Sequence, residues 1–122
     1  MFNRVVTSAF IVLSTVAIAG DAFAHAHLKA SMPADKSMVA AAPKTLNLSF
    51  TETLNLKFSG VEVTGPDKAV VKTGEAALSD KDTGLTVPVL GALPAGDYTV
   101  KWHVLSTDGH KTSGSFGFVV KP

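Results

Sequence analysis

The sequence predicts an all-β domain, a small antiparallel sandwich or Greek-key barrel of about seven short strands. Apolar and polar residues alternate with period two along several segments, and the 3.6-residue period of a long helix does not recur. Turn-forming clusters of Gly, Pro and Asp separate these segments. Because the chain has no cysteine, its core must hold the sandwich together without a disulfide framework.

Residues 1–24 are predicted to be a cleaved signal peptide that precedes a single domain at 25–122. Arg4 supplies a short positive start, and the uncharged, mostly apolar run Val5–Ala19 is short for a membrane span. Ala22-Phe23-Ala24 then places small residues where signal peptidase requires them. An uncleaved anchor is the alternative, but we expect a freely soluble, exported protein.

The charge of the predicted domain argues against a nucleic-acid-binding protein. Removing residues 1–24 takes away one basic and one acidic residue, Arg4 and Asp21, so the formal net charge remains +1. Nucleic-acid binders usually carry a strong basic excess. The lack of cysteine also excludes a thiolate metal site, a cysteine nucleophile and a lipid-anchoring cysteine.

The first half of the domain contains two predicted strands. Thr45–Phe50 alternates cleanly, whereas Phe58–Val63 alternates less regularly and Gly60 suggests a β-bulge. Gly65–Lys68 is predicted to be a turn. Earlier in the chain, Ser37–Ala42 is expected to form one helical turn at most.

Two short apolar runs follow, at Ala69–Val71 and Leu85–Leu90. Pro88 in the second run indicates either an edge strand or a break, because proline cannot donate a hydrogen bond to a sheet. Asp80–Asp82 is expected to be a solvated turn, and Pro94–Asp97 a further turn.

The two most regular strands come last, at Tyr98–Ser106 and Thr112–Val120. Phe116 and Phe118 share one face of the second strand, and the turn Asp108-Gly109-His110 joins the two. In the first strand, one face is apolar (Tyr98, Val100, Trp102, Val104) and the other is polar (Thr99, Lys101, His103). Tyr98 and Trp102 are predicted to lie in the core, and His103 is predicted to be exposed.

The histidines and one aspartate suggest a metal site. Cleavage after Ala24 would leave His25 with a free α-amine, which can chelate one metal ion together with the ring Nδ1. A bend can aim Asp108 and His110 at the same point. One amine, two imidazoles and one carboxylate suit tetragonal Cu(II), which lies at the top of the Irving–Williams series. Zinc would accept the same ligands tetrahedrally.

These motifs resemble the CopC family of periplasmic copper-resistance proteins, especially its short YobA-like branch. The likeness runs through HAHLKASMPA, LNLSFTETL, FSGVEVTGP and LPAGDYTVKWHVLSTDGHKTSGSFGFVV. The last segment is the most specific, because Tyr-x-Val-x-Trp, Ser-x-Asp-x-His and Gly-x-Phe-x-Phe occur there in that order. The resemblance implies a cupredoxin-like or immunoglobulin-like β-sandwich.

The resemblance also implies a ligand set. His25 would bind Cu(II) through its amine and its ring, and Asp108 and His110 would add a carboxylate and an imidazole. Glu52 corresponds to a weak axial ligand or a group behind the ligands. His27 is a further candidate, either as a ligand, as a partner of a ligand or as a solvated residue.

The identity of the first mature residue matters for this set. Ala24-His25-Ala26 also fits a cleavage site, and cleavage after Ala26 would make His27 the N-terminus. The position of Pro33-Ala34, eight residues after His25, agrees with the family register and favours His25.

The leading hypothesis is a non-catalytic, monomeric Cu(II) carrier or buffer of the periplasm. The resemblance implies an inner-membrane CopD-type copper transport protein as its partner. No dedicated Cu(I) site is expected, because Met32 and Met38 form no Met-x-Met run and Cu(I) prefers thioether ligands.

Two other classes of function are the alternatives. A histidine-brace copper oxidoreductase would also use an N-terminal histidine, but it needs an open coordination position, which Asp108 would fill. A metal-free β-sandwich interaction domain would need neither His25 at the cleavage point nor the Asp108–His110 pair.

Overall fold

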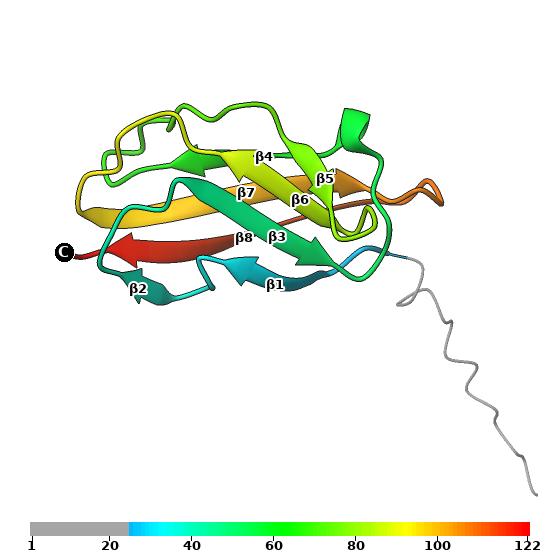
Figure 1. The fold of residues 1–122 in the computed structure, drawn as a ribbon, viewed down its shortest axis with the longest axis horizontal. Coiled ribbons are helices and arrows are strands. Elements are labelled where there is room, and N and C mark those ends of the chain that lie inside the picture. The colour runs from blue at the N-terminus through cyan, green and yellow to red at the C-terminus, as the bar shows by residue number, and fades with distance from the viewer. Residues whose placement is uncertain (1–24) are drawn as a thin grey trace, which may run out of the picture.

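The computed structural model describes residues 25–122, and the predicted signal peptide lies outside the described residues. Within this range two four-stranded sheets pack face to face (Figure 1), which confirms the predicted β-sandwich. The first sheet has the order β1 (Leu28–Met32), β3 (Thr45–Phe50), β6 (Gly84–Pro88), β5 (Ala77–Ser79). The second has the order β2 (Ser37–Val39), β8 (Lys111–Val120), β7 (Gly96–Leu105), β4 (Gly60–Thr64).

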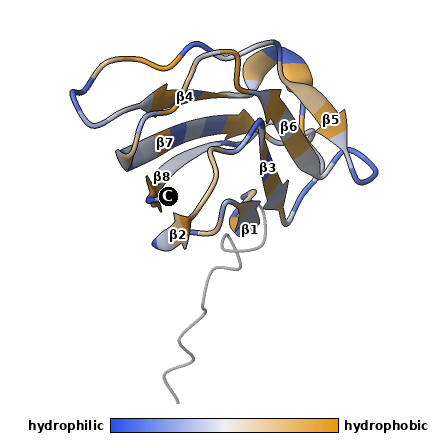
Figure 2. Ribbon diagram, turned by 60° about the vertical axis from the view of Figure 1, so that its left-hand side comes forward, coloured by the Kyte–Doolittle hydropathy of each residue, from blue (hydrophilic) through white to orange (hydrophobic). Residues whose placement is uncertain are grey.

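The core lies between the two sheets, and the period-two pattern of the strands produces it. Apolar and polar residues alternate along β7 in Figure 2, and the apolar face of this strand is buried while its polar face is exposed. Phe116 and Phe118 of β8, which were predicted to share one face, are both buried. Leu46, Leu48 and Phe50 of β3 close the core from the other sheet.

The segment Ser37–Val39 differs from the prediction. It is the strand β2, which pairs in parallel with the end of β8 from Ser37↔Phe118 to Val39↔Val120. The expected helical turn at Ser37–Ala42 is therefore wrong, and the second sheet is mixed rather than purely antiparallel. The Lys36 amide begins this pairing by donating to the Gly117 carbonyl at 2.7 Å.

The segment before β4 also differs from the prediction. Leu56–Phe58 form the 3-10 helix η2, in which the Asn55 side chain accepts a hydrogen bond from the Lys57 amide. The strand therefore starts at Gly60, two residues later than expected. Its register with β7 is continuous, so Gly60 marks no bulge.

Pro88 ends β6, which lies inside its sheet between β3 and β5. The predicted break at Pro88 is therefore confirmed, whereas the alternative of an edge strand is wrong, because β6 has a neighbour on each side. The other predicted apolar run, Ala69–Val71, forms no named strand; its Val70 makes an isolated β-bridge with Thr64. Asp80–Asp82 is an exposed turn, as predicted.

The fold brings the start of the described chain to the β7–β8 hairpin (Figure 1). Ala26 is fully buried, and its carbonyl accepts a hydrogen bond from Thr112 Oγ1 of β8 at 2.8 Å. The backbone of His27 bonds to Thr51 just after β3, through its amide and its carbonyl. These contacts fix residues 25–27 against both sheets. In the described part of the chain no helix is long and apolar enough to cross a membrane.

Candidate metal centre

The loop between β7 and β8 is organised around a buried serine. Ser106 is 2% exposed, and its hydroxyl donates to Asp108 Oδ1 and accepts from the His110 amide. The Ser106 amide donates to the His110 carbonyl at 2.9 Å, and the Gly109 amide donates to the Ser106 carbonyl at 2.9 Å. Gly109 has a φ of +94°, a backbone conformation that glycine adopts without strain. The bend therefore holds Asp108 and His110 on one side of the loop.

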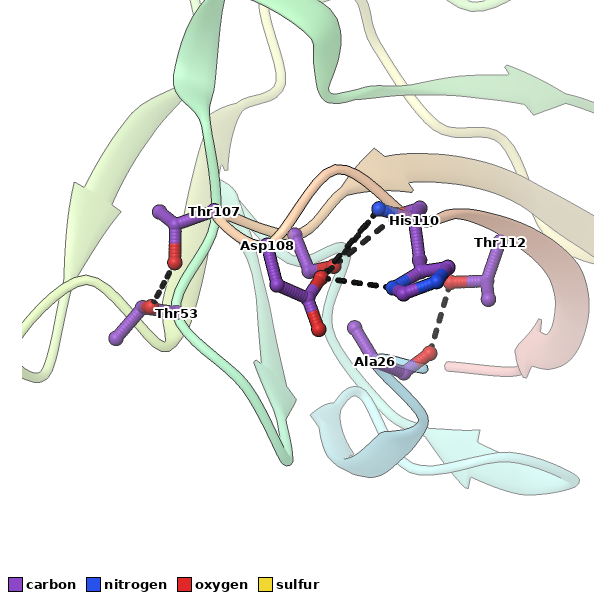
Figure 3. A network of polar contacts seen from close by, with 7 residues as sticks. Ala26, Thr53, Thr107, Asp108, His110 and Thr112 are labelled. Carbon is purple, nitrogen blue, oxygen red and sulfur yellow. Dashed lines mark hydrogen bonds and ion pairs between the residues drawn. The ribbon is translucent and has the colours of Figure 1, made fainter. Parts of the chain in front are cut away.

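Asp108 and His110 form an ion-pair contact, with His110 Nδ1 3.1 Å from Asp108 Oδ1 (Figure 3). The hydrogen bond from the Ser106 hydroxyl, followed by the contacts with His110, lowers the pKa of Asp108 and outweighs the opposing effect of desolvation. The carboxylate is therefore ionised at neutral pH. Nδ1 of His110 faces the carboxylate, so Nε2 points away from it, and one of the two side chains must turn before both can bind one metal.

His25 lies against His110. The centroids of the two imidazole rings are 4.8 Å apart, with an edge-to-face angle of 69°. The Nδ1 atom of His25 is buried and has no hydrogen-bond partner among the described residues. A buried polar nitrogen without a partner is costly, and a bound metal ion would satisfy it. Nδ1 is also the ring nitrogen nearest the backbone, as chelation with the α-amine requires.

The structure thus brings together three of the five predicted site residues as a row, His25–His110–Asp108. In residues 25–122, no three His, Asp or Glu side chains already surround one point closely enough to hold a metal. His27 is exposed and is positioned through its backbone. The half-buried Glu52 side chain has no hydrogen bond or ion pair within the described range.

Sequence reasoning assigned no positioning role to the residues that hold this row, although Ser106 is part of the Ser-x-Asp-x-His motif. Ser106 orients Asp108. Thr112 fixes the backbone next to His25 through the Ala26 carbonyl (Figure 3). Thr107 ties the loop to the segment that follows β3, since its hydroxyl lies 2.6 Å from that of Thr53. The one available signal was Ser106 itself, a polar residue at the end of an otherwise apolar strand face.

Two further predictions concern aromatic residues near the loop. His103 is exposed on the outer face of β7, as expected. Trp102 is 8% exposed and packs edge-to-face on Phe50, with ring centroids 5.2 Å apart. Trp102 is therefore a core residue, as predicted.

Comparison with known protein families gives a match to the CopC domain over residues 28–121. Protein YobA of Escherichia coli K12 is 42% identical over 114 residues, which cover 93% of this chain and 92% of the relative. Copper resistance protein C of Xanthomonas campestris pv. juglandis is 38% identical over 126 residues, which cover 98% of each chain.

Solved structures agree with these sequence relatives. CopC from Methylosinus trichosporium OB3b has a TM-score of 0.73 and 33% identity, over 80% of this chain and 95% of that chain. PcoC, a methionine-rich copper resistance protein from Escherichia coli, has a TM-score of 0.70 and 34% identity, over 80% of this chain and 99% of that chain. The match to the CopC domain and the identity to these relatives show that the chain belongs to the CopC family, and its β-sandwich agrees with this.

Proposed function

We propose that this protein binds one Cu(II) ion per chain and carries or buffers copper in the periplasm, after cleavage before His25. The ligands are the α-amine and Nδ1 of His25, an imidazole nitrogen of His110 and a carboxylate oxygen of Asp108. The observation that supports this best is the buried Nδ1 of His25, which lacks a hydrogen-bond partner and lies beside the His110 ring.

The chemistry of the donors supports copper. Three nitrogens and one oxygen, without sulfur, form the set that Cu(II) favours in a tetragonal plane. Asp108 Oδ1 already accepts hydrogen bonds from the loop, so its second oxygen remains for the metal. Two imidazole nitrogens on one ion lie within about 4 Å of each other, a separation that the contact between the two rings allows.

A carrier fits this donor set better than an oxidoreductase. The protein itself would fill all four positions in the plane, so no position remains in which oxygen could be activated. Three sequence relatives whose chains match this one end to end are named Copper resistance protein C. An inner-membrane CopD-type protein is the partner that we propose, and the carrier is proposed to be a monomer.

We propose no dedicated Cu(I) site. PcoC is described as methionine-rich, whereas this chain has three methionines in all, the first at position 1. Met32 ends β1 in one sheet and Met38 lies in β2 of the other, and both are more than 60% exposed. Glu52 is proposed as a weak axial ligand or as a group behind the ligands. His27 is proposed as a neighbour of the ligands and not as one of the four.

The proposal is tested by moving the amine while keeping every side chain. We expect the chain that begins at His25 to bind one Cu(II), with nitrogen couplings in its electron paramagnetic resonance spectrum. One alanine added before His25 should lower copper affinity by at least about a hundredfold, since the chelate ring can no longer close. Competition with a Cu(II) chelator measures the change.

His25→Ala is the positive control for loss of the site, and His103→Ala is the matched control for a histidine outside it. The alanine extension should resemble the first variant and His103→Ala should resemble the unmodified chain. Equal copper affinity with and without the added alanine would show that the amine is not a ligand. A stoichiometry near zero would exclude the whole site.

A further inference from the structure

A pocket of about 560 Å³ lies beside the candidate metal centre, between η2 and the outer face of β7 and β8. Its lining includes Lys57 and Phe58 of η2, His103 of β7, and Lys111 and Ser113 of β8. The volume is in the range of ordinary ligand pockets. Lys111 directly follows the predicted ligand His110, so the pocket and the metal centre share the start of β8.

The charges that line this pocket all have the same sign. Two lysines contribute to it, and no carboxylate does. Within residues 25–122 no lysine forms an ion pair. The ammonium groups of Lys57 and Lys111 are therefore not paired with a carboxylate of the described protein. Both lysines are exposed. The pocket is therefore complementary to a ligand with more than one negative charge.

The pocket also has an apolar part. Phe58 is 50% exposed, which is high for a large aromatic residue, and the Lys57 ammonium lies 5.7 Å from the centre of its ring. Leu56 of the same short helix is 38% exposed. Gly60 pairs with His103, and a β-carbon at Gly60 would lie 3.2 Å from His103 Cε1. The glycine therefore leaves space beside the imidazole ring.

We propose that this pocket docks an acidic peptide segment of a partner protein, with an apolar side chain placed between carboxylates. The two lysines belong to different elements, η2 and β8, so their charges suit a segment with several carboxylates better than a small monocarboxylate. The apolar side chain packs on Phe58. Charge pairs of this kind speed association and select the partner. None of the pocket residues is a proposed copper ligand, so docking leaves the metal centre complete and adjacent to the partner.

The test uses the copper-free chain that begins at His25 and the probe peptide acetyl-Glu-Asp-Leu-Asp-Glu-amide. Nuclear magnetic resonance of the ¹⁵N-labelled protein should show amide shifts that cluster at His103, Lys111 and Ser113. The double variant Lys57→Glu, Lys111→Glu should weaken peptide affinity by at least about tenfold.

The matched control is Lys44→Glu with Lys121→Glu, which changes the net charge equally at the other end of the sandwich. It should retain the affinity of the unmodified chain, and equal weakening in both double variants would overturn the proposal in favour of general charge attraction. Phe58→Ser should also weaken binding while both lysines remain. Identical shifts with sodium acetate would indicate a simple anion site and would likewise overturn it.

This test is independent of the proposed copper function. Copper titration of the Lys57→Glu, Lys111→Glu variant should match that of the unmodified chain, since both side chains lie outside the ligand set. Failure of peptide binding with intact copper binding would reject the docking pocket alone. Loss of copper binding in the unmodified chain would reject the carrier alone.

Discussion

Ser106 shows how one buried hydroxyl can organise a functional loop. It is the one buried polar residue of the described chain, and it bonds to the side chain of Asp108 and to the backbone of His110. A buried polar group is stabilising only when its hydrogen bonds are satisfied. The same bonds that satisfy Ser106 also orient two predicted metal ligands.

Ser106→Ala should therefore impair the site more than the fold. Without the hydroxyl, the pKa of Asp108 should rise toward its usual value, because the largest cause of its depression is removed. Copper affinity should fall by about tenfold, since the carboxylate and His110 lose a fixed orientation. Chelator competition and a pH titration of Asp108 by nuclear magnetic resonance measure the two effects, and Ser106→Thr should restore both.

The sign of the pH effect follows from this pKa. The depressed pKa of folded Asp108 means that its ionised form stabilises the protein above about pH 4, the usual value for an unfolded aspartate. That contribution is lost as the pH falls through the folded pKa. The Ser106→Ala variant should show a smaller loss of stability in acid, and an unchanged acid transition would contradict the role of Ser106.

Among single residues, the sequence points to the candidate metal ligands more readily than to the residues that position them. His25, Asp108 and His110 are candidates because their chemistry, and their place after a predicted cleavage site or in a turn, are visible along the chain. Ser106 and Thr112 act through contacts whose partners depend on the folded loop, and for Thr112 the partner is 86 residues away. Such contacts leave no local pattern.

At the level of elements, the β7–β8 hairpin carries both the core and the site. Trp102 of β7 lies opposite Gly114 of β8, and the missing side chain of this glycine makes room for the indole ring. The ring then packs on Phe50 of the other sheet. The hairpin is thereby fixed to the first sheet close to the loop that holds Asp108 and His110.

Gly114→Ala should destabilise the fold. A β-carbon there would lie 2.5 Å from Trp102 Cζ2 and 2.8 Å from Cε2, so the indole ring must move. Overpacking of this kind costs about 1–3 kcal/mol of unfolding free energy. Thermal unfolding measures the loss, and fluorescence of the single tryptophan reports its displacement. Ser115→Ala, an exposed position on the same strand, is the control, and equal melting temperatures would contradict the packing role of Gly114.

The elements that the sequence predicted well are those with a long regular alternation, β3, β7 and β8. β2 was mistaken for a helical turn because three residues are too few to show a period, and its pairing with β8 is set by contacts some 80 residues away. Phe58, the last residue of η2, was assigned to the following strand because it is apolar, although it is 50% exposed. Tertiary context overrides local propensity at such short segments.

For the whole molecule, stability rests on one core shared by two sheets. No disulfide is possible, so the chain relies on burial of residues such as Leu48, Leu85 and Val100. A metal that binds only the folded chain adds to this stability by mass action. The proposed copper site therefore predicts a change in the stability of the entire domain.

Copper at about one hundred times its dissociation constant should stabilise the chain that begins at His25 by about 2.7 kcal/mol. For a domain of this size, that corresponds to a rise in melting temperature on the order of 10 °C. Calorimetry with and without Cu(II) measures the rise. The chain with one alanine added before His25 is the control and should show little of it; an equal rise in both chains would mean that copper binds elsewhere.

The parallel pairing of β2 with β8 has a mechanical consequence. β2 leads back through β1 to His25, and β8 leads directly to Pro122, so a pull on the two ends draws these strands in opposite directions along their own axes. The hydrogen bonds from Lys36 to Gly117 and from Lys121 to Val39 span this pairing. They carry such a load together, in shear, whereas a strand peeled from its end would break its bonds one by one. Tension that passes β1 should thus be resisted in shear at β2, although it is the shortest strand of its sheet.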